Sequence, residues 1–352
     1  MKNKYIFTPG PVLMGKEILD IGAQQTPYFR NEEFSQTLLE CEKNLLRLLN
    51  APKNSRVIFL TASGTAAMES AVANLIADDD KTVVINGGGF GERFVDICNI
   101  YEKENIVYTP KDNITDTSTL PHNVDNLLIN AHETSIGRLY DIESIGNFCK
   151  EHTILNIVDA ISMFLTDELD MQKFNIDALL LSSQKALALP PGMSFVILNE
   201  KAQAKLQNVR SLYFNYKLYL KDGTRGQTPF TPAVTIILQL QKRLEQLLSF
   251  GIENEIQKAQ KIASYFRESI KKLPLKAYSE YMPNAMTTLS PTDGKKASQI
   301  VKDLDKIYNI VVTPNGGALQ EKIFRVSHMG AMSIEYTDIL IDALFDYYGE
   351  ER

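Results

Sequence analysis

Three groups of polar residues, each placed at the end of a short apolar run, could do chemistry together. Ser63, Gly64 and Thr65 follow one run, Asp159 ends a second, and Lys185 follows a third. Small residues at a helix N-terminus expose backbone N–H groups and hydroxyls that bind phosphates. A buried carboxylate requires a partner, and a desolvated lysine reacts with carbonyl groups. Each group also has an ordinary explanation, as a helix cap, a turn residue or a solvated cation.

A glycine-rich segment, 87–91, follows a fourth apolar run. The dinucleotide fingerprint G-x-G-x-x-G would need a glycine where Glu92 stands, which argues against a nucleotide-binding oxidoreductase. The glycines could instead let the backbone approach a flat ligand that stacks on Phe90. The alternative is a flexible turn in which Phe90 fills the core.

Together these groups match what pyridoxal phosphate requires of a protein. The cofactor needs an anchor for its phosphate, a stacking face, a carboxylate at its pyridine nitrogen and an amine for its aldehyde. The segment 63–65, Phe90, Asp159 and Lys185 supply these groups in one chain. The sequence therefore indicates a pyridoxal phosphate site.

The apolar runs predict an α/β fold that would position these residues. They alternate with stretches of helical periodicity, as in βαβ units, and most are continuously apolar, as in strands covered on both faces. We expect a mostly parallel seven-stranded sheet with helices on both faces and ligands at the carboxyl ends of its strands. The last two strands are joined too closely for a crossover helix and should be antiparallel. The runs are 56–63, 81–87, 105–110, 126–133, 153–160, 177–184 and 194–200.

The chain divides into three predicted parts. Residues 1–14 are rich in Pro and Gly and predict an irregular segment, which would pack at the active site. Residues 15–245 form the large cofactor domain, and residues 246–352 form a smaller α+β domain. Two long helices, 232–249 and 252–273, should meet at Gly251 near this boundary.

Composition excludes several classes of protein. The chain has 352 residues, a formal net charge of −6, three cysteines and four histidines. The negative charge argues against a nucleic acid or a membrane surface as partner. The scattered cysteines and histidines predict neither a disulfide framework nor a metal site. The chain has no run of ~20 apolar residues and no apolar signal segment, so we expect a cytoplasmic protein.

Several motifs resemble those of the class V aminotransferases of fold type I. The nearest branch is the alanine–glyoxylate, serine–pyruvate and 2-aminoethylphosphonate–pyruvate group. The similarity covers nearly the whole chain. The matching stretches are TPGPV (8–12), RNEEF (30–34), SGTAAMES (63–70), NGGGFGERF (86–94), HETSIGRLYDI (132–142), VDAIS (158–162), SSQKALALPPG (182–192), QTPFTPAV (227–234) and FRVSHMG (324–330).

This resemblance implies a role for individual residues. Lys185 would hold the cofactor as a Schiff base and move the proton of the substrate α-carbon. Asp159 would pair with the pyridinium nitrogen, Phe90 would stack on the ring, and Arg325 would clamp the substrate carboxylate in bidentate fashion. Four residues would hold the phosphate: Ser63, Gly64, Thr65 and Gln184. Thr134 would lie near the 3-hydroxyl group of the ring.

The resemblance also implies a homodimer with shared active sites. Thr231, with Gln227 or Thr228, would reach the cofactor phosphate of the partner subunit across an isologous interface. Gly10 and Arg30 would lie at the substrate entrance. The segments around Arg30 and Thr231 depart from the commonest family pattern, so they bear on substrate identity.

The implied function is a transaminase that moves an amino group from serine, alanine or 2-aminoethylphosphonate to pyruvate or glyoxylate by a ping-pong mechanism. One alternative is another reaction on the same fold, such as a desulfurase-like lyase or a decarboxylase. Gln184 stands where the desulfurases usually have histidine, and all three cysteines fall in predicted helices. A second alternative is a non-catalytic binding protein, against which the presence of Lys185, Asp159 and Arg325 argues.

Overall fold

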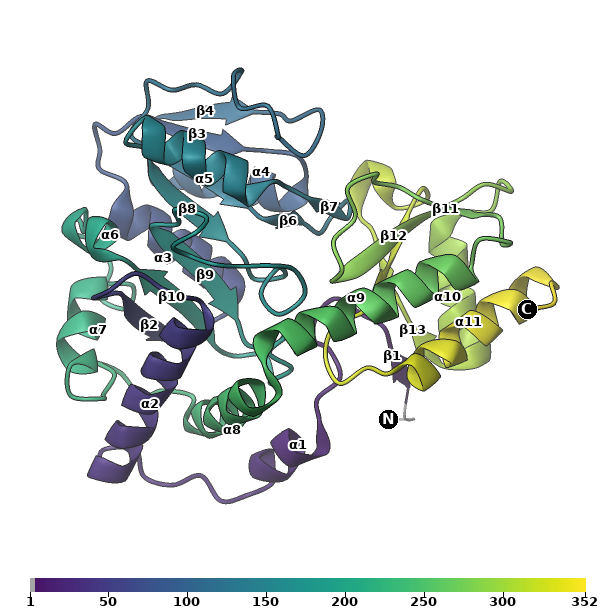
Figure 1. Cartoon of the computed structure of the whole chain (residues 1–352), viewed down its shortest axis with the longest axis horizontal. Helices are drawn as coiled ribbons and strands as arrows, with labels where there is room; N and C mark the ends of the chain where they lie inside the picture. Colours follow the sequence, from purple (N-terminus) through teal and green to yellow (C-terminus); the bar gives the residue numbers. More distant parts are fainter. Residues whose placement is uncertain (1–3) are drawn as a thin grey trace.

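A seven-stranded sheet forms the centre of the computed structural model, which describes residues 4–352 (Figure 1). Its strands, in spatial order, are β2 (Arg56–Leu60), β10 (Ser194–Leu198), β9 (Ala178–Ser182), β8 (Leu155–Asp159), β5 (Asn126–Asn130), β3 (Thr82–Ile85) and β4 (Asn105–Tyr108). All are parallel except β10, which runs antiparallel to both neighbours. Each strand lies within one of the seven apolar runs, so the predicted sheet and its antiparallel pair are confirmed.

Helices cover both faces of this sheet, as predicted, because successive side chains of a strand point to opposite sides. In β2, Val57 and Phe59 enter one apolar core, whereas Ile58 and Leu60 enter the other. The first core is completed by α2 (Glu32–Leu48), α5 (Ile142–Glu151) and α8 (Val234–Phe250). The second is completed by α3 (Gly64–Leu75), α4 (Gly89–Ile100), α6 (Glu200–Ala204) and α7 (Tyr216–Gly223).

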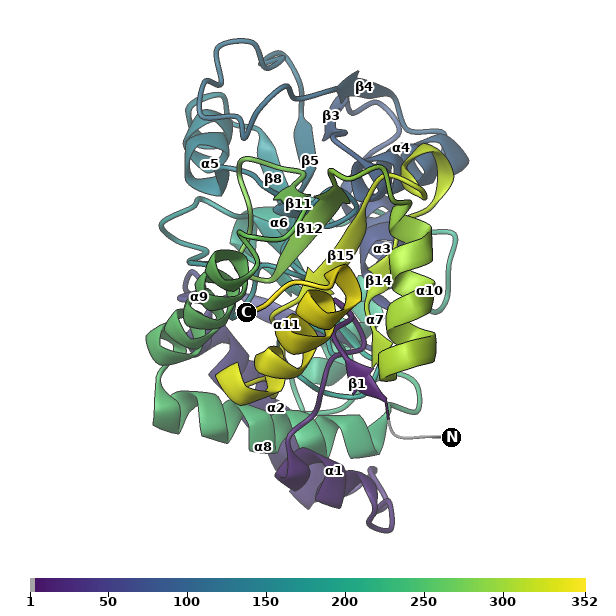
Figure 2. The same cartoon turned by 90° about the vertical axis from the view of Figure 1, so that its right-hand side faces the viewer.

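A second, antiparallel sheet follows in the C-terminal part of the chain. Its strands, in spatial order, are β11 (Leu275–Ala277), β12 (Met286–Pro291), β15 (Phe324–Ser327) and β14 (Thr313–Pro314). With helices α9 (Ile252–Ser269), α10 (Ala297–Tyr308) and α11 (Ile334–Tyr348) it encloses a third apolar core. This unit lies beside the large sheet in Figure 1, where α9 runs from one to the other, and in front of it in Figure 2.

The predicted helix break at Gly251 is present. Gly251 has a φ of +92°, a conformation that other residues rarely adopt, and it lies between the end of α8 and the start of α9. The buried side chains of α8 belong to the first core, whereas Ile262 and Phe266 of α9 belong to the third. The domain limits at residues 245 and 246 stay a prediction.

The N-terminal segment is more regular than the sequence predicts. Residues Tyr5–Ile6 form β1, which pairs in parallel with β13 (Ile310–Val311) (Figure 1). The sequence did not predict this strand, because two residues are too few to show a periodicity; apart from it and a bridge at Leu13, residues 4–14 are irregular, as predicted. The chain then bridges Leu13 to Gly330 and enters α1 (Lys16–Gly22), which packs on α8. Residues 1–3 of the predicted segment lie outside the described part.

Among residues 4–352 no helix is long and apolar enough to cross a membrane. The same residues contain no group of three or more His, Cys, Asp and Glu side chains placed to hold a metal ion.

We expect Phe7→Ala to lower the free energy of unfolding by about 3–5 kcal/mol, because the ring is fully buried in the third core. The neighbouring substitution Tyr5→Ala is the control, since the Tyr5 side chain is 41% exposed and should cost about 1 kcal/mol. Urea denaturation measures both. Equal losses in the two variants would show that Phe7 does not fasten the N-terminal segment.

Candidate active site

A cavity of about 210 Å³ lies where the carboxyl ends of several strands of the large sheet meet. It brings together many of the predicted site residues from distant parts of the sequence. These are Ser63, Gly64, Thr65, Phe90, Thr134, Asp159, Gln184 and Lys185. The position agrees with the rule that ligands of open α/β sheets bind beyond the carboxyl ends of the strands.

Asp159 is the last residue of β8, and its carboxylate is buried in the cavity wall. One oxygen accepts a hydrogen bond of 2.6 Å from Asn130 Nδ2, and the other accepts one of 2.9 Å from the backbone N–H of Ile161. Burial raises the pKa of the Asp159 carboxyl to about 6, although both hydrogen bonds oppose this shift. A cation or an N–H donor in the cavity would restore its negative charge.

Lys185 stands beside Asp159 in the cavity. Burial lowers the pKa of its ammonium group to about 8; the positive charges of Arg325 and Arg93 add to this shift, and Asp159 opposes it. The chain at Gly10 passes directly over the lysine, because a Cβ placed on Gly10 would lie 3.1 Å from Lys185 Nζ. Gly10 also has a φ of +152°, so both the close approach to Lys185 and the backbone conformation favour glycine at this position.

The N-terminus of α3 lines the cavity and could hold an anion there. Ser63 precedes the helix but does not cap it with its side chain, so the first N–H groups point outward without that partner. Gln184 accepts a hydrogen bond of 2.5 Å from Ser182 through its amide oxygen, which turns its amide nitrogen away from Ser182. Arg93 donates a 3.1 Å hydrogen bond to Thr65 Oγ1. The dipole of α3 and this guanidinium together favour a bound phosphate.

Phe90 and Glu133 are joined at the opposite wall. The buried carboxylate of Glu133, in the short strand β6 (His132–Glu133), accepts hydrogen bonds from the backbone N–H groups of Phe90 and Gly91, the latter 2.9 Å long. These N–H groups begin α4, whose dipole stabilises the anion. Phe90 is half-buried, and the Arg93 guanidinium lies 4.7 Å from the centre of its ring.

Arg325 comes from β15 of the second sheet and contacts Thr134, a residue of the cavity lining. Its guanidinium donates hydrogen bonds to the backbone oxygens of Thr134 at 3.2 Å and Pro314 at 2.9 Å, and its Nε is buried without a partner. Burial lowers the pKa of Arg325, and the charge of Glu133 opposes the shift. Within residues 4–352 no carboxylate forms an ion pair with it, so it can receive the carboxylate of a ligand.

Several predicted residues do not line the cavity of this chain, and of these Arg30 and Thr231 lie at the surface. Arg30 is exposed and donates hydrogen bonds to Gln227 Oε1 and the Thr228 backbone oxygen. Thr231 is also exposed and lines a separate surface hollow with Tyr28. Thr231 is predicted to act on a partner subunit, which a single chain does not test.

The sequence reasoning missed several residues that line the cavity. Met68, Ile161 and Ser162 lie close to predicted residues in the sequence, whereas Arg93 and His132 are charged or polar groups that had no assigned role. The spacing of Arg93, three residues after Phe90 and therefore on the same face of a helix, could have indicated it.

Comparison with known proteins gives the family. Residues 23–329 match the family model described as Aminotransferase class-V. An uncharacterized aminotransferase of Methanocaldococcus jannaschii is 30% identical, with 93% of this chain and 88% of the relative covered. An L-aspartate–glyoxylate aminotransferase of Paracoccus denitrificans is 26% identical, with 93% and 87% covered.

The solved structure of a subgroup IV aspartate aminotransferase from Thermus thermophilus superposes with a TM-score of 0.90. It is 25% identical and the match covers 97% of this chain and 99% of that one. The chain thus belongs to the class V aminotransferases and is a pyridoxal-phosphate-dependent transaminase of fold type I.

Proposed function

We propose that this transaminase moves an amino group from serine, alanine or 2-aminoethylphosphonate to pyruvate or glyoxylate by a ping-pong mechanism. The observation that carries the proposal is that Lys185 and Asp159 line one cavity, while the guanidinium of Arg325 binds the backbone of Thr134 in the same lining. The small cavity suits small substrates.

Pyridoxal phosphate, when bound, supplies an aldehyde that captures amines and a ring that accepts electrons from the substrate α-carbon. The residues of the cavity fit this group. The N-terminus of α3, with Ser63, Gly64, Thr65 and Gln184, would hold the phosphate, and Arg93 would add a positive charge there. Asp159 would accept the N–H of the pyridinium ring, which supplies the partner that its buried carboxylate lacks.

Lys185 would attach the cofactor and then carry the proton of the α-carbon. An amine with a pKa of about 8 has roughly one molecule in ten uncharged at pH 7, and an ordinary lysine has far fewer. The lowered pKa therefore gives Lys185 a free electron pair for accepting a proton near neutral pH. Phe90 would cover one face of the ring, and Thr134 would contact its edge.

Arg325 would bind the substrate carboxylate through its free guanidinium edge. Because its other N–H groups are fixed on two backbone oxygens, the fork is already oriented before a ligand arrives. Gly10 leaves room above Lys185 for this ligand, and Arg30 would act farther out, toward the entrance. Thr231 would reach the phosphate of a partner subunit in a homodimer.

The proposed acceptor is supported by the name of the Paracoccus denitrificans relative, which uses glyoxylate. The same name, and that of the Thermus thermophilus structure, add aspartate to the donors that should be assayed. The cysteines argue against a desulfurase. Cys41, Cys98 and Cys149 are buried in helices, and burial raises the pKa of Cys98 and Cys149 to about 12. None of the three cysteines lies on a loop, where a desulfurase would carry its nucleophilic thiolate.

The main test follows the visible absorbance of the lysine-bound cofactor. We expect one of the donors, added alone, to bleach it, and pyruvate or glyoxylate to restore it. Initial rates at several concentrations of both substrates should give parallel double-reciprocal lines. Lys185→Ala should lack this absorbance. Absorbance that no donor bleaches, or release of carbon dioxide or sulfide with turnover, would refute the proposal.

For Asp159→Asn we expect cofactor to remain partly bound while the rate of donor bleaching falls ~100-fold, because the ring loses the charge that keeps its nitrogen protonated. Stopped-flow absorbance measures the rate. Asp78→Asn is the control, since that side chain is 99% exposed in the large domain. A near-normal rate in Asp159→Asn would contradict the assigned role.

For Arg325→Lys we expect the KM of carboxylate donors to rise ~10- to 100-fold with the cofactor absorbance intact, because lysine keeps the charge but loses the bidentate fork. Arg325→Ala should raise the KM further. Steady-state kinetics with the best donor provide the measurement. An unchanged KM in both variants would show that the carboxylate binds elsewhere.

A further inference from the structure

The wall of the cavity contains a histidine that the proposed function does not use. His132 lies two residues beyond β5, and its side chain is fully buried in the cavity wall. Its Nε2 is 3.2 Å from Asp167 Oδ2, a distance that suits an ion pair, although the N–H direction does not suit a hydrogen bond. Its Nδ1 has no partner among the described residues. A buried polar nitrogen without a partner next to a cavity is explained if a ligand supplies the partner.

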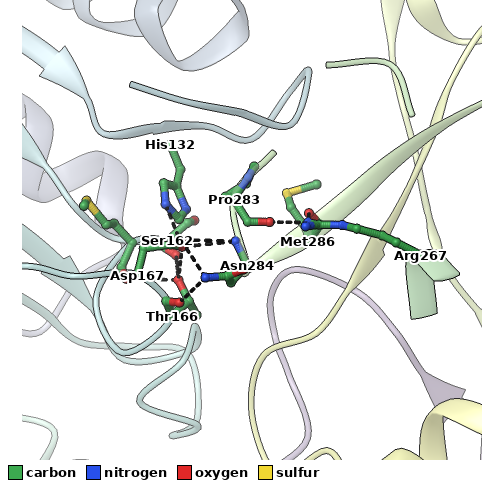
Figure 3. Close-up of polar contacts among 9 residues, drawn as sticks. His132, Ser162, Thr166, Asp167, Arg267, Pro283, Asn284 and Met286 are labelled. Atoms are coloured by element: carbon green, nitrogen blue, oxygen red, sulfur yellow. Dashed lines mark hydrogen bonds and ion pairs between the residues drawn. The ribbon is translucent and has the colours of Figure 1, made fainter. Parts of the chain in front are cut away.

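Asp167 is held firmly on its other sides (Figure 3). It accepts hydrogen bonds from the backbone N–H of Asn284 at 3.2 Å, from Asn284 Nδ2 at 2.9 Å and from Thr166 Oγ1 at 3.0 Å. Asn284 Nδ2 also donates to the Thr166 backbone oxygen. The carboxylate is therefore fixed in position and can orient the imidazole of His132, as second partners of histidine commonly do.

Helix α9 fixes the turn that carries Asn284. Arg267 of α9 donates hydrogen bonds to the backbone oxygens of Pro283 at 2.5 Å and Met286 at 3.0 Å, on either side of Asn284 (Figure 3). The orientation of His132 thus depends on contacts between the two sheets.

The strand order indicates which part of the cofactor His132 would meet. The four residues predicted to hold the phosphate follow β2 and β9, on one side of β8, whereas His132 and Thr134 follow β5, on the other side. Arg93 follows β3 and reaches Thr65 from that other side. With the pyridine nitrogen at Asp159, the flank of the ring opposite the phosphate bears the 3-oxygen. His132 lies on the side of that oxygen.

We propose that His132, with Asp167 as its counter-ion, donates a hydrogen bond from Nδ1 to the anionic 3-oxygen of bound pyridoxal phosphate. The inference rests on the proposed function, since it requires the cofactor to bind as described above. His132 then acts as a positioning group that stabilises negative charge on the ring oxygen. Other charged groups around the cavity are Asp159, Glu133, Lys185, Arg93 and Arg325.

The proposal has a spectroscopic consequence. The colour of the lysine-bound cofactor changes with pH as the linkage to Lys185 loses its proton, and a donor to the 3-oxygen favours the deprotonated form. Removing the donor should therefore raise the pH midpoint of the colour change. For His132→Leu in the cofactor-loaded enzyme we expect a rise of about one pH unit.

His132→Asn is the matched variant. Leucine and asparagine have the same branching, and Asn Nδ2 would occupy the place of His Nδ1, so only asparagine keeps a donor there. We expect His132→Asn to recover at least half of the shift. The exposed His152→Asn is the control and should leave the midpoint unchanged. A thermal melt of each variant shows that it is folded.

A double-mutant cycle tests the role of Asp167. If the carboxylate acts through His132, Asp167→Asn should change the midpoint differently in the wild type and in His132→Leu. Additive effects would refute the role of Asp167. The proposal would be overturned if the midpoint of His132→Leu were unchanged or lowered. It would also be overturned if His132→Asn had the same midpoint as His132→Leu. If the wild type has no cofactor absorbance that depends on Lys185, it is the proposed function that fails.

Discussion

The buried carboxylate of Glu133 is the interaction on which the cavity depends. It has no cation within ion-pair distance in residues 4–352, and it is stabilised by the N–H groups at the start of α4 and by Ser135. Through these hydrogen bonds the Glu133 carboxylate fixes Phe90 on one side and Thr134 on the other. Arg325 binds the backbone of Thr134, so the second sheet is aligned on the same short segment. A buried anion is costly unless such donors surround it, so this arrangement has little freedom to shift.

The large sheet could be predicted from the sequence because its strands are buried on both faces. In β2 the side chains from Val57 to Leu60 alternate between two cores, so each must be apolar, and the run stands out. The short strands could not be predicted. β1 and β6 have two residues each, too few for a periodicity, and β1 is defined by a partner at Ile310 near the other end of the chain.

The site was predictable to the extent that its residues follow strands. Asp159 and Lys185 stand out because polar groups at the ends of apolar runs need an explanation, whereas Arg325 was found only through the resemblance. The sequence could not indicate the roles of His132, Asp167 and Asn284, since these roles depend on contacts among three segments that are far apart in the chain. Nothing local in the sequence distinguishes Asp167 from an exposed acidic residue. The roles of Arg30 and Thr231 stay predictions, because they concern the substrate and a partner subunit.

The path of the N-terminal segment has a consequence for biosynthesis. Gly10 lies over Lys185, yet the segment is fastened at Ile310, Val311 and Gly330. Residues 5–13 therefore have no place to dock until the chain has been made as far as Gly330. The large sheet can form earlier, with its lysine uncovered. The segment that covers Lys185 is thus made before the residues that fasten it, and it can close over the lysine only after them.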